Sequence, residues 1–398
     1  MALPEIFSIK KVSCVEGGKV VKNSAIVVDN GIISFVGHQN SAPLQDNDSF
    51  NADGWYVSPG FIDLQLNGGY GYDFTENPES IPLVAKRLPE TGVVSFLPTF
   101  ITSPLSKYPQ KLVATLSARQ TGGNSARVLG AHLEGPFLNP GFPGAHPVSL
   151  LCNSTPDRLS MFSPIEAVRM VTLAVELPGG LQAVKWLQDQ GVVVSIGHSG
   201  ATTEEAQQSF SAGVRFVTHV FNAMPPLHHR QPGLIGALLT THGIRAGLIA
   251  DAIHCHPVML ELAYRCKGAA EIALVTDAMA AMGMPPGQYS IGGQEVFVDD
   301  TSARLRDGKL AGSILSMDQA VRNMVRHTSC SLAEAVQMAS AVPADVLGMG
   351  DCIGHIKKGY SADIVLMDES LHIQATLVGG QIAFATPEAL DKLTQNGG

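Results

Sequence analysis

Apolar runs alternate with helical segments through the middle of the chain. Seven of these runs are predicted strands: Phe61–Leu66, Val93–Pro98, Arg127–Leu133, Val192–Ile196, Arg215–Val220, Ala246–Ala250 and Ile272–Thr276. Short apolar runs between helices are typical of βαβ units and a parallel sheet. With about eight strand candidates over roughly 290 residues, a (β/α)8 TIM-like barrel is the simplest fold that closes the sheet on itself. A doubly wound open sheet is the alternative. No G-x-G-x-x-G pattern follows the first strand, so the sequence does not favour a dinucleotide-binding fold.

Both ends of the chain have the pattern of short strands and turns. Ala25–Val28 and Ile32–Val36 flank an Asp-Asn-Gly turn, which is typical of a hairpin, and Ala362–Met367 and Ile373–Val378 form a second strand-rich region. Neither region is large enough to make a core alone, so we expect them to pack together as one small β-sandwich domain. The predicted division is a composite β-sandwich domain at 1–56 and 350–398, and a metal-dependent (β/α)8 barrel catalytic domain at 57–349.

Composition restricts the class of function. The 398 residues are 45% hydrophobic and 15% charged, with a formal net charge of −9, which favours a large core and provides no basic stripe for nucleic acid. No run approaches the roughly 20 apolar residues of a membrane span, and the first residues lack the pattern of a signal peptide. Six scattered cysteines without a C-x-x-C pair argue against a disulfide framework. We expect a cytoplasmic protein that acts on a small molecule.

Two histidines end consecutive predicted strands. His198 and His219 are separated by one helix, which the capping-box pair Thr202 and Glu205 begins and which runs over Glu204–Ala212. In a parallel sheet the C-terminal ends of strands lie at one face, where ligands gather. A histidine that merely caps a strand is the alternative for either residue alone, but two at matching positions favour a site.

Two carboxylates occupy equivalent positions. Glu134 follows Arg127–Leu133, and Asp277 follows Ile272–Thr276. One Glu and two His give three ligands with an open position for water, which is typical of catalytic rather than structural zinc. Asp277 would then be available to move protons, although a lone aspartate at a strand end can also be a helix N-cap. Gln65 and Asn67 share one face of the first barrel strand, where weak amide ligands could hold a metal-bound water but favour a single metal.

Three loops are candidates for ligand binding. Phe221–Gly233 carries an amide, imidazoles and one arginine and could bind an anion, Asp251–His254 follows another strand, and Leu310–Ser313 offers small residues beside its backbone. Exposed loop histidines without a function are the better interpretation of His228, His229 and His256.

The order and combination of motifs closely resemble those of the N-acetylglucosamine-6-phosphate deacetylases of the amidohydrolase superfamily. The matching segments run nearly end to end: Pro59–Asp63, Leu66–Gly68, His132–Phe137, Gly197–Ser199, Thr218–His219, Phe221–Met224, Val275–Ala278 and Gly354–Val365. The resemblance implies a hydrolase that converts N-acetyl-D-glucosamine 6-phosphate to D-glucosamine 6-phosphate and acetate.

The resemblance also assigns roles to individual residues. It implies that Glu134, His198 and His219 bind a divalent metal, that Asp277 is the general base and then the acid for attack by a metal-bound hydroxide, and that His146 polarises the acetamide carbonyl. Substrate contacts are implied at Ala145, His146, Asn222, Ala223, Arg230, Asp251, His254, Leu310, Ala311 and Gly312. Among these, Arg230 and His254 would hold the 6-phosphate.

The implied cofactor is one divalent metal ion per chain, for which the ligand set suits Zn²⁺ and also admits Fe²⁺, Co²⁺ or Mn²⁺. Because one phosphate-binding group of this family can come from a neighbouring subunit, a homodimer is implied. Gln65 and Asn67 replace the H-x-H of many superfamily members, which weakens the case for a second metal. The alternatives are an amidohydrolase acting on a related amide, such as a cyclic-amide hydrolase, and a catalytically silent sugar-phosphate-binding homologue.

Overall fold

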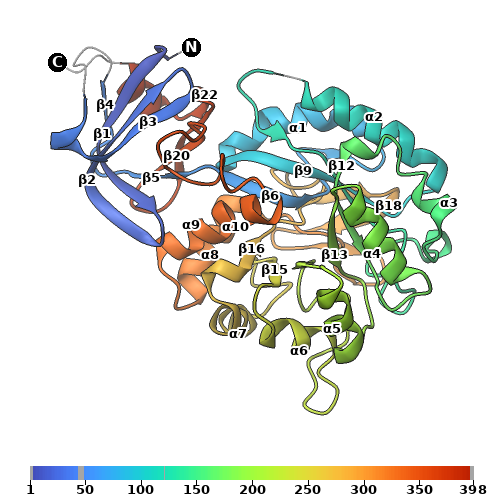
Figure 1. Cartoon of the computed structure of the whole chain (residues 1–398). Helices are drawn as coiled ribbons and strands as arrows, with labels where there is room; N and C mark the ends of the chain where they lie inside the picture. Colours follow the sequence, from blue (N-terminus) through green and yellow to red (C-terminus); the bar gives the residue numbers. More distant parts are fainter. Residues whose placement is uncertain (1–2, 44–48, 121, 395–398) are drawn as a thin grey trace.

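The computed structural model describes residues 3–43, 49–120 and 122–394, and its largest part is a barrel of eight parallel strands (Figure 1). The strands follow one another around the barrel in chain order: β6 (Phe61–Leu66), β9 (Val93–Ile101), β11 (Ala131–Glu134), β12 (Val168–Leu173), β13 (Val193–Ile196), β14 (Phe216–Val217), β15 (Arg245–Leu248) and β16 (Ile272–Leu274). An isolated pairing of Leu66 with Ala278 and a 2.8 Å hydrogen bond from the Asp277 N–H to the Gln65 carbonyl close the ring. The predicted barrel is confirmed.

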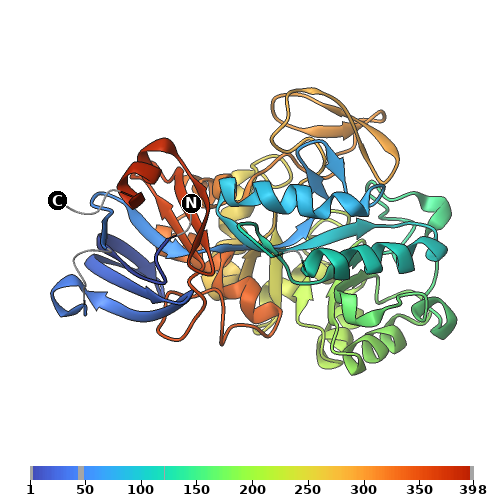
Figure 2. The same ribbon diagram turned by 90° about the horizontal axis from the view of Figure 1, so that it is seen from above.

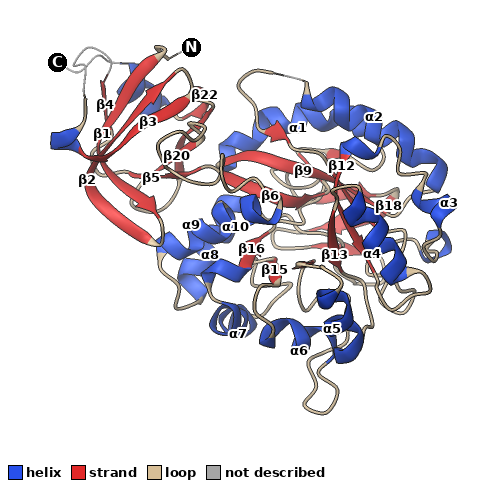
Figure 3. Ribbon diagram, in the orientation of Figure 1, coloured by secondary structure: helices blue, strands red, loops and turns tan. Residues whose placement is uncertain are grey.

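Helices surround these strands (Figure 3). All nine residues of β9 are buried, and strands buried on both faces need an outer layer of apolar helix faces. The helices of this part are α1 (Ile81–Arg87), α2 (Tyr108–Arg119), α3 (Pro156–Leu159), α4 (Gly180–Asp189), α5 (Thr203–Ser211), α6 (Gly233–Thr240), α7 (Pro257–Lys267), α8 (Met317–His327), α9 (Leu332–Ala339) and α10 (Ala341–Val346). Helix α5 begins at the predicted capping box of Thr202 and Glu205. None of the helices in the described ranges has the length and hydropathy needed to cross a bilayer.

Two strand predictions differ from the structure. The predicted strand Arg127–Leu133 is divided into β10 (Arg127–Val128) and β11, because Gly130 between them has a φ of +140°, which favours glycine and interrupts the ladder. The barrel strand β12 was not among the predicted runs, since Arg169 and Thr172 interrupt its apolar pattern. The first difference has a local cause, whereas in the second the tertiary fold overrides the local sequence pattern.

The two ends of the chain form one eight-stranded sheet beside the barrel (Figure 1). Its strands are β1 (Ile6–Glu16), β2 (Lys19–Asp29), β3 (Ile32–His38), β4 (Ser49–Asn51), β5 (Tyr56–Pro59), β20 (Ile364–Met367), β21 (Ile373–Val378) and β22 (Gln381–Ala385), with α11 (Pro387–Thr394) after them. Strands β5 and β20 pair antiparallel and join the two ends of the chain. Ile26 and Leu377 belong to one buried cluster, so the sheet encloses a core of its own.

The predicted β domain from both termini is therefore confirmed, while its boundaries at 1–56 and 350–398 stay a prediction. Residues 1–2, 44–48 and 395–398 of that prediction lie outside the described residues.

A three-stranded antiparallel insert follows the last barrel strand. It consists of β17 (Gly287–Ile291), β18 (Gln294–Val298) and β19 (Ala303–Leu305). Figure 2 shows this insert, in orange, projecting from the barrel near the small hairpin of β7 (Gly68–Gly69) and β8 (Tyr72–Asp73). The insert thus lies beside the segment that follows the first barrel strand.

Candidate metal centre and active site

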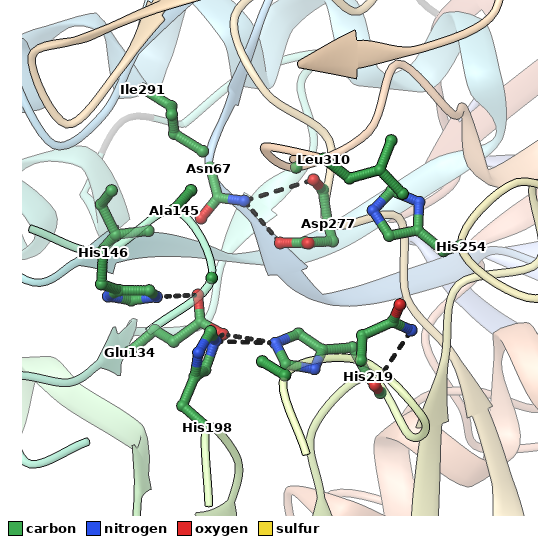
Figure 4. Close-up of a pocket in the computed structure, with 15 residues that line it drawn as sticks. Asn67, Glu134, Ala145, His146, His198, His219, His254, Asp277, Ile291 and Leu310 are labelled. Carbon is green, nitrogen blue, oxygen red and sulfur yellow. Dashed lines mark hydrogen bonds and ion pairs between the residues drawn. The ribbon is translucent and has the colours of Figure 1, made fainter. Parts of the chain in front are cut away.

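Four of the predicted site residues lie at the C-terminal edge of the barrel. Glu134 ends β11, His198 and His219 each come two residues after β13 and β14, and Asp277 follows β16. Because the strands are parallel, these positions share one edge, and Figure 4 shows the four side chains pointing toward one another.

Glu134, His198 and His219 form a compact buried cluster. Their potential ligand atoms all lie within 4.8 Å of one another. Oε1 of Glu134 lies 3.0 Å from Nε2 of His219 and 3.3 Å from Nε2 of His198, and the two imidazole nitrogens are 3.1 Å apart. Three ligand atoms therefore converge on one point.

Unusual backbone conformations direct these side chains. His198, His219 and Asp277 have φ values of +48°, +26° and +49°, in the left-handed region that non-glycine residues rarely adopt. Such conformations persist only where the surrounding structure holds them, and they concentrate at functional sites. Gly144 faces His198, and a Cβ at this position would lie 2.9 Å from the imidazole Cε1. The close packing leaves no room for a larger residue there.

The donor set fits a divalent metal. The Nδ1 of His198 lies 2.9 Å from the carbonyl of Phe142, so this nitrogen carries the proton and Nε2 presents a lone pair to the cluster. Among the described residues, Nδ1 of His219, Oε1 of Gln65 and Oδ1 of Asn67 are buried without a hydrogen-bond partner. Buried polar atoms are nearly always paired, so this edge of the barrel is built to receive a polar ligand.

Electrostatics separate the two carboxylates. Burial would raise the pKa of Glu134, but the neighbouring imidazoles of His146, His198 and His219 hold it well below its usual range. Burial, and then the negative charge of Glu134, raise the pKa of Asp277 to about 6. Glu134 is therefore suited to remain an anionic ligand, while Asp277 can gain and lose a proton near neutral pH.

Most of the predicted substrate contacts line the same pocket. Those that do are Ala145, His146, Asn222, Ala223, His254, Leu310 and Gly312, together with Asn67 and the four residues above. Gln65 lies buried behind the pocket, and Ala311 is also buried without lining it. Asp251 does not line it either, but its Oδ2 lies 2.6 Å from Nδ1 of His254 and orients that ring.

The structure does not bring Arg230 into this pocket. Arg230 is exposed in the loop between His219 and α6, and this loop projects from the barrel in Figure 1. Its side chain lines a separate hollow with Thr202 and Pro232.

Several residues that shape the site were missed. Ile101 and Ile291 line the pocket, and the Thr102 N–H donates to Nδ1 of His146 across 3.2 Å. Glu176 accepts a 2.6 Å hydrogen bond from the Gly200 N–H and so holds the loop after His198. Glu176 follows strand β12, so a correct prediction of that strand would have indicated this residue. Ile101, Ile291 and Thr102 have no local sequence pattern that marks them as site residues.

A barrel that holds such a cluster beside a proton-carrying aspartate is typical of metal-dependent hydrolases. The sequence profile of the amidohydrolase family matches residues 56–386. The chain is 41% identical over 350 residues to an N-acetylglucosamine-6-phosphate deacetylase of Mus musculus, covering 84% of this chain and 85% of that protein. An N-acetylgalactosamine-6-phosphate deacetylase of Escherichia coli O157:H7 is 41% identical over 330 residues, covering 82% of this chain and 87% of that protein.

Among solved structures, a mutant N-acetyl-D-glucosamine-6-phosphate deacetylase from Mycobacterium smegmatis, in complex with N-acetyl-D-glucosamine-6-phosphate, has a TM-score of 0.90 and 28% identity. It matches 96% of this chain and 100% of that one. The chain belongs to the amidohydrolase family and, within it, to the family of the N-acetylglucosamine-6-phosphate deacetylases. It is a hydrolase.

Proposed function

We propose that the protein hydrolyses N-acetyl-D-glucosamine 6-phosphate to D-glucosamine 6-phosphate and acetate. The proposal depends on one observation: the cluster of Glu134, His198 and His219 shares a pocket with Asp277. The relative from Mus musculus, 41% identical over 84% of this chain, carries the name of this activity. An assay of acetate release from the phosphorylated sugar, with and without chelator and added metals, tests the proposal. Absence of acetate after metal addition would reject it.

In this proposal Glu134, His198 and His219 hold one divalent ion, with zinc favoured and iron, cobalt or manganese as alternatives. When bound, the ion supplies Lewis acidity, which makes water a nucleophile near neutral pH and polarises the amide carbonyl. A single ion is proposed because Gln65 and Asn67 offer only amides, which are poor metal ligands.

Asp277 moves the proton in both halves of the reaction. As a carboxylate it accepts a proton from the attacking water, and it then donates this proton to the amide nitrogen while the C–N bond breaks. An amide nitrogen leaves only when protonated, so the same residue acts as base and then as acid. Its pKa of about 6 suits both roles near neutral pH.

His146 orients and polarises the acetamide carbonyl. Because the Thr102 N–H donates to Nδ1 of His146, that nitrogen is an acceptor and Nε2 is the nitrogen that can donate. That nitrogen lies 3.6 Å from Oε2 of Glu134 and so lies beside the cluster. A hydrogen bond from Nε2 to the developing oxyanion would contribute roughly 3 to 4 kcal/mol, as for other oxyanion donors.

The phosphate is bound at the other end of the pocket. His254, whose ring Asp251 orients, lines the pocket, as do Asn222 and Ala223. Arg230 projects from an exposed loop away from its own pocket. We therefore propose a homodimer in which Arg230 reaches the phosphate in the pocket of the partner subunit.

A second candidate substrate is N-acetyl-D-galactosamine 6-phosphate. The observation that favours it is the relative from Escherichia coli O157:H7, which is 41% identical and named for that substrate. The two sugars differ in configuration at one hydroxyl, so kcat/KM measured on both separates the two proposals.

A further inference from the structure

One wall of the pocket is apolar. Ile101, Ala145 and Ile291 line the pocket and belong to, or pack against, one cluster of buried apolar side chains. In Figure 4, Ile291 lies above Ala145 and near Asn67, on the same side of Asp277 as His146 and opposite His254. The apolar wall and His254 thus lie on opposite sides of the pocket, with the reactive groups between them.

Ile291 comes from the tip of the insert hairpin, and this tip is tied to the barrel. Strands β17 and β18 are joined by Gly292 and Gly293, whose φ values of +55° and +78° are typical of a tight two-residue turn. The Gly292 N–H donates to Oδ2 of Asp73 across 2.6 Å, and Oδ1 of Asp73 accepts a 2.8 Å hydrogen bond from the Thr75 N–H. Asp73 therefore joins the tip to the loop that follows β6.

Two further contacts fix the tip. The Nε2 of Gln294 donates to the carbonyl of Ala145, directly before His146. A Cβ on Gly292 would lie 2.5 Å from Cδ1 of Ile101, so the turn packs directly against the pocket wall. The Oγ1 of Thr75 accepts a 3.1 Å hydrogen bond from the Ile101 N–H. The apolar wall formed by Ile101, Ala145 and Ile291 therefore cannot move away from the pocket without breaking several of these contacts.

We propose that Ile291, held in place by Asp73 and Gln294, limits the acyl group that the enzyme removes to acetyl. This inference rests on the proposed function. In this proposal the phosphate lies at His254 and the carbonyl at His146, which places the methyl of the acetyl group on the side of the pocket that Ala145 and Ile291 line. An acyl chain longer by one or two methylenes meets the branched side chain of Ile291.

The test compares acyl chain lengths. The measurement is kcat/KM for release of acetate, propionate and butyrate from the corresponding N-acyl-glucosamine 6-phosphates. We expect the unmodified enzyme to prefer acetyl to butyryl by at least about tenfold, since a pocket discriminates a methylene by roughly 10- to 200-fold. Ile291→Ala should reduce this preference about tenfold or more, and the milder Ile291→Val should admit propionyl.

Val296→Ala is the matched control. Val296 is fully buried in the same cluster on β18, but it does not line the pocket. Its truncation loosens the insert to a similar degree and should leave the preference for acetyl unchanged. Asp73 and Gln294 are positioning residues. The variants Asp73→Asn and Gln294→Ala should therefore reduce the preference for acetyl, as Ile291→Ala does.

A second readout does not depend on turnover. In an Asp277→Asn background, the N-butyryl sugar should raise Tm only when Ile291→Ala is also present, whereas the N-acetyl sugar should raise it in both. An unchanged acyl preference in Ile291→Ala and Ile291→Val, or an equal change in Val296→Ala, would overturn the inference. Failure of the proposed function is distinguishable, because the unmodified enzyme would then release no acetate at all.

Discussion

Asn67 donates a side-chain N–H to Oδ1 of Asp277 across 2.7 Å, which connects the two strand ends that close the barrel. Gln65 donates to the same oxygen across 3.1 Å and to Oε1 of Glu134 across 2.9 Å. Oδ1 of Asp277 thus accepts hydrogen bonds from two side-chain amides, whereas no residue in the described part of the chain forms a hydrogen bond with Oδ2. Oδ2 is therefore the oxygen that exchanges the proton.

Asp277→Asn should fold normally and lose most of its turnover. The oxygen of the new amide can accept the hydrogen bonds from Gln65 and Asn67, but the amide group in place of Oδ2 cannot accept a proton. We expect kcat to fall about 100- to 10,000-fold, the usual contribution of a general acid–base, with metal content unchanged. Steady-state kinetics and elemental analysis measure both quantities. Asp391→Asn, on the exposed surface of α11, is the control, and near-native turnover of Asp277→Asn would refute the assignment.

Purified protein should contain about one divalent metal ion per chain, as expected for a three-ligand catalytic site. His198→Asn should abolish stoichiometric binding, because Nε2 of His198 is one of the three convergent ligand atoms. Elemental analysis after dialysis measures the content directly. His228→Asn removes an exposed loop histidine and should retain the metal. Equal metal content in the two variants would exclude a metal site at this cluster.

Arg230→Ala should reduce kcat/KM on the phosphorylated sugar far more than on unphosphorylated N-acetylglucosamine. The reason is that a cationic guanidinium pairs with a phosphate, which the second sugar lacks. Kinetics on the two sugars provide the measurement. Equal losses on both would argue against a phosphate role.

The dimer proposal has its own test, which mixes Arg230→Ala with Asp277→Asn subunits. If Arg230 acts across the interface, each mixed dimer has one site with both Asp277 and a partner guanidinium, so activity should recover on exchange of subunits. If Arg230 acts within its own chain, no mixed dimer contains an intact site, and activity should stay at the level of the separate variants.

Glu16 should contribute stability that depends on pH. Its Oε1 lies 2.8 Å from Nδ1 of His355, and its Oε2 accepts a 2.8 Å hydrogen bond from the Ile356 N–H. Burial alone would raise the pKa of Glu16, but these hydrogen bonds lower it below its usual value. A depressed folded-state pKa stabilises the fold above the unfolded value of about 4.3, and this contribution is lost as the pH falls through the folded pKa.

Glu16→Gln should therefore lower Tm at pH 7. The free energy of unfolding should fall by about 1 to 3 kcal/mol, the usual value of a hydrogen bond to a charged group. The difference from the unmodified protein should shrink as the pH approaches 4. Thermal unfolding across this range measures it. Glu295→Gln, which removes an exposed ion pair with Arg306, should change Tm little at any pH. A pH-independent difference for Glu16→Gln would contradict the prediction.

The parts of the fold that depend on local sequence were predictable. The turn between β2 and β3 and the capping box of α5 follow from residues that are adjacent or three apart. The positions of His198 and His219 followed from a rule of parallel sheets, because strand ends share an edge. The motifs shared with the deacetylase family added the function.

Contacts that depend on closure of the barrel were not predictable from local pattern. Gln65 bonds to a carboxylate 212 positions away, which no periodicity reveals. Ile291 enters the pocket from the tip of an unpredicted insert, which Asp73 and Gln294 hold. Arg230 was assigned a role by resemblance, but the sequence alone did not show that it lies outside its own pocket.

The pairing of β5 with β20 has a consequence for synthesis of the chain. β5 ends at Pro59 and β20 begins at Ile364, so the ribosome adds about 300 residues between them, which takes roughly 15 to 60 s at 5 to 20 residues per second. During that time the nascent N-terminal strands have an unpaired edge that can associate with other chains. The edge of β5 is therefore covered only by strands that are made about 300 residues later.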